Sequence, residues 1–231
     1  MGINQTLRTK LGEYAEEKHR QYHMSVVLGQ KNMLGVRMPK VRELAKWAAK
    51  QDWQSEWEDL SEECYEELMI KGLLIGYGKL SREEQTAYLK KYIPLISSWE
   101  ICDGCCVTCK FMQKDQEYWF TFLQPYLRSE QELEARFAVV CMMNYFVNEE
   151  YLERLFQAFV EVKEYKYFSE IAVAWAVARC YIKYPSQTWE YLEKRSLNDY
   201  IRNQAIQKIR ESTKVSAEDK ERLLDLKVDT K

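Results

Sequence analysis

Residues 171–180 read IAVAWAVARC, a run in which Arg179 is the one charged residue. Two other segments are similarly apolar, LMIKGLLIGY at residues 68–77 and FAVVCMMNYF at residues 137–146. Each run is apolar on more than one side, which is typical of a helix buried between neighbours. The chain has eight Gly, four Pro and little alternation of period two, so strands are not expected. The sequence predicts an all-α protein.

The buried runs alternate with more amphipathic segments, such as residues 118–127 and 151–160. Helix start signals recur between them, among them Ser61, a capping box from Ser81 to Glu84, Ser98 and Ser216. The repeating unit is therefore a helix pair of roughly 30 to 40 residues, a period typical of HEAT-like repeats. We expect a right-handed solenoid of such pairs with a concave groove, in a single domain over residues 1–231.

Composition excludes several classes of protein. No secretory segment and no apolar run of about 18 residues is present. Seven Cys, an odd number, lie inside helical patterns, so we expect reduced thiols, a cytoplasmic location and no membrane contact. Walker, dinucleotide-glycine, HExxH and Ser-His-Asp signatures are missing, and no metal or cofactor is expected.

The sequence contains two groups of potential metal ligands. Cys102, Cys105, Cys106 and Cys109 have overlapping C-x-x-C spacings, but thiols within one short helical stretch cannot surround a tetrahedral zinc ion without other ligands. The histidines at positions 19 and 23 lie in a charged amino-terminal helix, where a solvated pair is expected.

The net charge of −2 conceals an uneven distribution. Residues 31–50 contain six basic residues against Glu43 alone, residues 52–67 contain eight acids and no base, and residues 179–214 contain eight bases against four acids. Two interpretations stay open, namely ordinary solvated helix faces or two basic ends that bind phosphates.

Aligning the inner helices by their apolar runs brings one conspicuous residue of each to a similar position, with steps of 32, 33, 39 and 33 residues. Equivalent positions of stacked repeats line up along one surface. We therefore expect a row of side chains on the concave face, made of Lys71, Asp103, Arg136, Trp175 and Lys208.

Trp99 and Asp103 are four residues apart, which places an indole and a carboxylate on one helix face. Asp103 lies in an uncharged stretch, so it needs a partner or a purpose; capping, or pairing with Lys71, is the structural alternative. Arg136 either reaches a phosphate or extends to water. Trp175 is either a core aromatic or a flat surface for a sugar, a base or a cation.

Four stretches together resemble one known family: LGVRMPKVRELAK at 34–46, WEICD at 99–103, the segment around Arg136, and IAVAWAVARCYIKYP at 171–185. The chain resembles the HEAT-like-repeat DNA alkylation repair proteins, the AlkD-type alkylpurine DNA glycosylases. The resemblance covers roughly residues 5–225, and the order and spacing of the motifs are more specific than any one of them.

The resemblance implies excision of N3- or N7-alkylated purines from duplex DNA. By motif, Trp99, Trp175 and Asp103 are similar to the residues that contact the deoxyribose of the damaged nucleotide, and Arg136 to an arginine that holds the DNA. We therefore assign Asp103, Trp99 and Trp175 to catalysis, and the expected partner is double-stranded DNA with alkylated purines, bound by a monomer. The expected DNA-binding residues are Arg136, Lys71, Lys208, Arg37 and Lys40. A non-catalytic paralogue that binds DNA structures and a HEAT-type protein scaffold are the alternatives.

Overall fold

The computed structural model describes residues 2–27, 32–163 and 166–228, and all regular structure within them is helical. The predicted all-α class is confirmed. The chain divides into two compact units, residues 1–111 and 112–231. Lys31, which the sequence places in the amino-terminal basic segment, lies outside the described residues.

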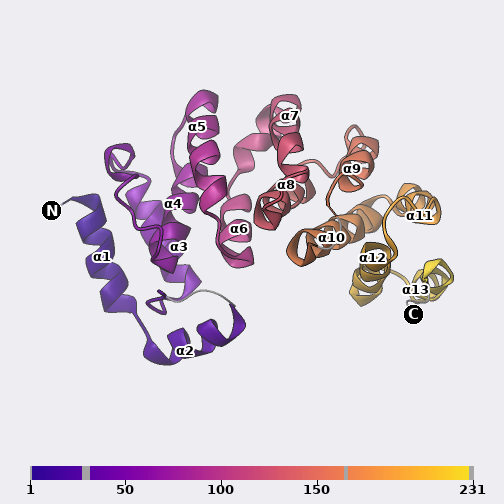
Figure 1. Cartoon of the computed structure of the whole chain (residues 1–231), viewed down its shortest axis with the longest axis horizontal. Helices are drawn as coiled ribbons and strands as arrows, with labels where there is room; N and C mark the ends of the chain where they lie inside the picture. Colours follow the sequence, from indigo (N-terminus) through magenta and orange to yellow (C-terminus); the bar gives the residue numbers. More distant parts are fainter. Residues whose placement is uncertain (1, 28–31, 164–165, 229–231) are drawn as a thin grey trace. The chain divides into compact units, whose positions relative to one another are not determined.

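Unit one contains the helices coloured indigo to magenta in Figure 1. They are α1 (Ile3–Tyr14), α2 (Glu17–Val26), α3 (Met38–Ala48), η1 (Gln54–Glu56), α4 (Tyr65–Tyr77), α5 (Arg82–Tyr92), η2 (Ile93–Leu95) and α6 (Trp99–Cys106), with the short η3 (Lys110–Lys114) at the boundary between the units.

Helix α4 forms the centre of unit one. It packs against α3, α5 and α6, and α1 packs on α3. Every residue from Tyr65 to Ile75 is buried, which confirms the predicted helix buried between neighbours. Burying each large aliphatic side chain stabilises the fold by about 1.5–3 kcal/mol. The aliphatic residues of α4 therefore contribute strongly to the stability of this unit.

A glycine lets the end of α6 come close to α4. A Cβ atom on Gly76 would lie 2.1 Å from Oγ1 of Thr108, and 2.7 Å from the Thr108 carbonyl carbon. No other residue type fits between these two backbones without a shift. The close approach sets the position of α6, which carries two of the predicted catalytic residues.

The acidic stretch at residues 52–67 is partly internal. Glu66 is fully buried, and its carboxylate accepts hydrogen bonds from the backbone N–H groups of residues 34, 35 and 36 at 3.0, 2.8 and 3.1 Å. This carboxylate fixes the segment that leads into α3. The stretch is therefore not only a solvated acidic surface.

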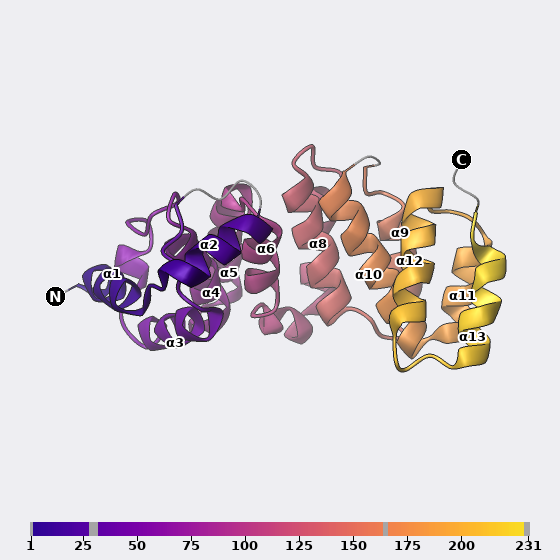
Figure 2. The ribbon, with the colours of Figure 1, turned by 90° about the horizontal axis from the view of Figure 1, so that it is seen from below.

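Unit two contains α7 (Gln116–Leu127), α8 (Glu132–Tyr145), α9 (Leu152–Phe159), α10 (Tyr167–Lys183), α11 (Pro185–Glu193), α12 (Asp199–Glu211), α13 (Ala217–Arg222) and η4 (Leu223–Leu226). Helix α10 packs between α8 and α12 and also contacts α9 and α11. Figure 2 shows α8, α10 and α12 side by side. The buried alanines of α10, at positions 172, 174, 176 and 178, let these neighbours approach closely.

The predicted helix starts at Ser81, Ser98 and Ser216 are confirmed, because each serine hydroxyl caps a helix and Ser81 forms a full capping box with Glu84. No helix in the described part of the chain is both long and apolar enough to cross a membrane. The right-handed HEAT-like solenoid, its concave groove and the single domain over residues 1–231 stay predictions.

Candidate functional site

Trp99 and Asp103 lie on one face of α6. Trp99 is the first residue of the helix, directly after the N-cap Ser98, whose hydroxyl accepts a hydrogen bond from the N–H of Ile101 at 3.3 Å. The cap fixes where the helix begins. Asp103 follows one turn later, so its carboxylate neighbours the indole. Both side chains are partly exposed.

These two side chains line a shallow depression of about 310 Å³ within unit one. This volume is at the lower end of the roughly 300–1,000 Å³ that is usual for ligand pockets. Met69 of α4, which is 1% exposed, gives it an apolar lining. The remaining lining residues come from α3, α4, α6 and the residue after α6: Met38, Arg42, Tyr65, Glu100, Gly104 and Val107.

A second carboxylate enters the same depression. Glu100, which directly follows Trp99 on α6, also lines it. Its Oε2 atom accepts a 2.7 Å hydrogen bond from the phenol of Tyr65. The same oxygen forms a hydrogen bond with Nε2 of His23, on α2. Donors from two other helices therefore hold this carboxylate in place. The sequence motif did not identify Glu100, because its partners lie 35 and 77 residues away.

His23 differs from the solvated residue that the sequence predicts. It is 9% exposed, its ring stacks on His19 with centroids 5.4 Å apart, and it meets the Tyr65 ring edge-on at 5.2 Å. Among the described residues, its buried Nδ1 atom has no hydrogen-bond partner. Burial and the bond to Glu100 raise the pKa of Tyr65 well above its ordinary value, so the phenol keeps the proton that it donates.

In unit two, Trp175 is partly exposed on α10 and Arg136 of α8 lies against it. The guanidinium carbon is 5.2 Å from the centre of the indole, and Nη1 donates a 2.8 Å hydrogen bond to the carbonyl of Phe168. Arg136 is only 1% exposed. The buried guanidinium therefore supports the ring of Trp175, and the expected contact of Arg136 with DNA stays a prediction.

Lys71 also departs from the expected row. It is fully buried, its ammonium lies 4.6 Å from the centre of the Trp57 ring, and it pairs with Glu62 at 3.2 Å. All sides of α4 are covered by other helices, so a residue at this repeat position points into packed protein. Lys71 is not exposed to a phosphate.

The other three predicted DNA-binding cations are paired with carboxylates. Arg37 pairs with Glu16 at 2.9 Å, and Lys40 with Glu43 at 2.9 Å. Lys208 pairs with Glu211 at 2.8 Å. These exposed ion pairs are worth little in stability, but each neutralises a charge that the sequence counts as basic.

Cys102, Cys105, Cys106 and Cys109 are fully buried free thiols. The hydrogen bond with Cys109, together with burial, raises the pKa of Cys105, so the group is a thiol and not a thiolate. In the described part of the chain, no group of three or more His, Cys, Asp or Glu side chains is placed to hold a metal ion.

The fold and the site define an all-helical protein that presents an indole and a carboxylate together in one depression. A family model described as "DNA alkylation repair enzyme" matches residues 6–211. The chain belongs to this family of DNA repair enzymes, as its motifs indicate. Neither a curated protein nor a solved structure gives a significant match to it.

Proposed function

We propose that this protein is a DNA glycosylase that hydrolyses the N-glycosidic bond of N3- or N7-alkylated purines in duplex DNA. The observation that carries the proposal is the depression that Trp99 and Asp103 line together, with Glu100 as a second carboxylate in its lining. Membership of the DNA alkylation repair enzyme family supports the choice of substrate.

The chemistry follows from the charge of the lesion. A purine alkylated at N3 or N7 is cationic and already a good leaving group, so little acid catalysis is needed. As the glycosidic bond breaks, both bonding electrons leave with the base and positive charge develops on the sugar. The protein then has to stabilise an oxocarbenium-like sugar until water adds to it.

The side chains of the depression suit this task. The Asp103 carboxylate stabilises positive charge on the sugar through its field, and it can take the proton of the attacking water. The Trp99 indole adds an electron-rich face, and a cation–π contact is worth about 0.5–2 kcal/mol. We further propose that Trp175 contacts the same nucleotide, with Arg136 holding its ring.

The test is release of free base from a duplex that contains one 7-methylguanine, compared with the same duplex without the lesion. The account expects free 7-methylguanine and an abasic site to appear together, at a rate above spontaneous depurination. Binding of the duplex without release of base would refute the glycosylase hypothesis and favour the non-catalytic DNA binder. No binding to duplex would leave the protein scaffold.

A further inference from the structure

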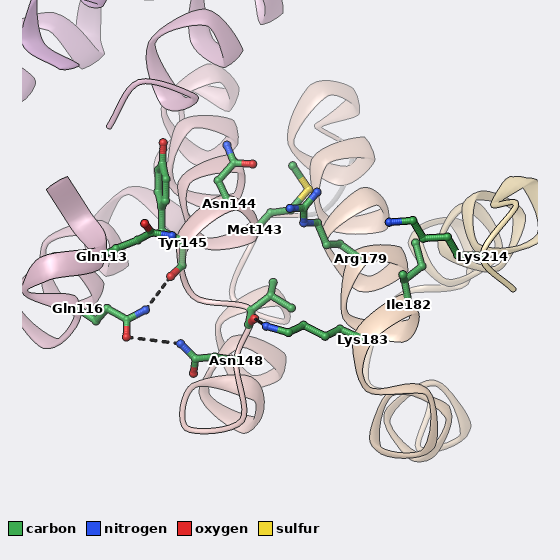
Figure 3. Close-up of a pocket in the computed structure, with 11 residues that line it drawn as sticks. Gln113, Gln116, Met143, Asn144, Tyr145, Asn148, Arg179, Ile182, Lys183 and Lys214 are labelled. Atoms are coloured by element: carbon green, nitrogen blue, oxygen red, sulfur yellow. Dashed lines mark hydrogen bonds between the residues drawn. The ribbon is translucent and has the colours of Figure 1, made fainter. Parts of the chain in front are cut away.

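A basic pocket of about 570 Å³ lies in unit two, and its lining includes Arg179 and Lys214, the two ends of the carboxy-terminal basic segment. It is formed by the start of α7 and the residues before it, the end of α8, one face of α10 and Lys214 after α12 (Figure 3). Three of its eleven lining residues are cations, Arg179, Lys183 and Lys214, and none is a carboxylate. Its charge therefore favours an anion.

Two of these cations are not neutralised by the protein. Within the described residues, Arg179 and Lys214 are exposed and their side chains have no ion-pair or hydrogen-bond partner. Lys183 donates to the carbonyl of Val147 at 2.8 Å, which fixes its ammonium at the pocket without removing its charge. This state contrasts with Arg37, Lys40 and Lys208, which all carry a carboxylate partner.

Neutral donors accompany the cations. The amide of Gln116 donates to the Tyr145 carbonyl at 2.7 Å and accepts a hydrogen bond from Asn148 at 3.4 Å, and these bonds hold one side of the pocket (Figure 3). The side-chain amides of Gln113 and Asn144 have no partner within the described residues. Lysine, arginine and amide side chains together are the usual donors to DNA phosphates.

We propose that this pocket binds backbone phosphates of the DNA strand beside the nucleotide that Trp175 contacts. The identification of the ligand as DNA rests on the proposed function, although the pocket could bind DNA without base excision. Trp175, Arg179 and Lys183 follow at four-residue intervals on α10, and so lie on one face of the helix. The two cations are about 6 and 12 Å along the helix from Trp175.

This spacing limits which phosphates the pocket can hold. A DNA strand rises about 3.4 Å per nucleotide along the duplex axis. The bound phosphates should therefore lie within about five nucleotides of the lesion, at a fixed position in the strand. The pocket would set the register of the damaged strand and would contribute equally to damaged and undamaged duplexes.

The first experiment measures duplex affinity for the full chain with Arg179→Gln and Lys214→Gln, using Lys194→Gln as control. Lys194 is an exposed lysine of unit two that does not line this pocket. We expect each pocket variant to weaken binding on the order of tenfold, the effect of one charged hydrogen bond, and to lower the salt slope by about 1. Arg179→Lys should restore the slope. Pocket variants that match Lys194→Gln would overturn the proposal.

The second experiment replaces single phosphates by uncharged methylphosphonates along the damaged strand. Wild type should lose affinity at one or two positions within about five nucleotides of the lesion, and Arg179→Gln should lose nothing further at those positions. Equal losses in both proteins would contradict the assignment. If Arg179→Gln weakens binding of inorganic phosphate but not of duplex, the pocket takes a small anion and the proposal fails.

These outcomes separate the two proposals. A wild type that releases no base, but whose duplex binding depends on Arg179, would refute the glycosylase and keep the phosphate pocket. If wild type releases base, and neither Arg179→Gln nor Lys214→Gln changes duplex binding, the glycosylase is kept and the phosphate pocket is refuted.

Discussion

Asp103 and Glu100 share one face of α6, but their surroundings were not equally predictable. The WEICD motif places Trp99 and Asp103 together through helical periodicity alone. The partners of Glu100 come from α2 and α4, and no local spacing relates these helices to α6. The burial of Arg136 was unpredictable for the same reason. The sequence shows an arginine beside an apolar run, but it does not show that the Phe168 carbonyl accepts its hydrogen bond.

The Tyr65 phenol gives a prediction about pH. Its pKa is raised in the folded protein, by burial and by its bond to Glu100. Above the ordinary tyrosine pKa of 10.0, the unfolded chain loses a proton that the folded chain keeps, so this stabilising contribution is present below pH 10 and is lost as pH rises. Above pH 10, this contribution makes the free energy of unfolding in urea fall by up to about 1.4 kcal/mol per pH unit. The slope should be shallower by that amount in Tyr65→Phe.

The control for this measurement is Tyr22→Phe, which changes an exposed tyrosine of α2. It should leave the pH dependence of the unfolding free energy as in wild type. An identical alkaline slope in wild type and Tyr65→Phe would show that Tyr65 is not held protonated by its surroundings.

Trp175 gives a prediction about rate. If its indole contacts the sugar, Trp175→Ala should slow single-turnover excision by a factor of roughly 2 to 30, which corresponds to a cation–π contact of about 0.5–2 kcal/mol. Tyr167→Ala is the matched control, because Tyr167 is an exposed aromatic on the same helix. Equal rates for the two variants would remove Trp175 from the proposed site.

At the scale of elements, the apolar runs predict the buried helices α4, α8 and α10 well, since each run is apolar on more than one face. The start of α4 was less predictable. The sequence suggests a start at Ser61, whereas its hydroxyl accepts from the N–H groups of Glu63 and Cys64, and the helix begins at Tyr65. The Glu67 carboxylate accepts a hydrogen bond from the Ser61 N–H. Residues 61–64 are therefore held outside the helix.

The close packing of α4 and α6 gives a prediction about stability. Gly76→Ala should destabilise the protein by about 1–3 kcal/mol through overpacking against Thr108. Gly12→Ala is a control of opposite sign, because a Cβ on Gly12 of α1 would meet nothing within 4 Å. This control should stabilise the protein by up to about 1 kcal/mol, the difference in helix propensity. Urea denaturation of both variants measures the two effects, and a neutral Gly76→Ala would contradict the packing.

At the scale of the whole molecule, the sequence predicts where basic residues concentrate but not which of them stay charged toward solvent. Arg179 and Lys214 mark the ends of the carboxy-terminal basic segment, and the structure leaves both unpaired within the described residues. Arg37 and Lys40 belong to the amino-terminal segment, yet both carry glutamate partners. Pairing depends on which helices meet, which charge counts along the chain do not contain.

The repeat register has the same limit. It places Asp103 and Trp175 at partly exposed positions, but it also selects Lys71, which is buried because its helix has neighbours on every side. Register therefore identifies equivalent positions and not their exposure. The joint action of Trp99 and Asp103 with Trp175 on one nucleotide stays a proposal that kinetics can test.

The most direct test of the central claim is the excision rate of Asp103→Asn on a duplex with one 7-methylguanine. Asparagine keeps the size of the side chain but removes its charge, so duplex affinity should change little while the single-turnover rate falls on the order of 100-fold or more, the scale of one lost preorganised electrostatic contact. A variant that excises at the wild-type rate would contradict the proposed role of the Asp103 carboxylate in stabilising the sugar cation.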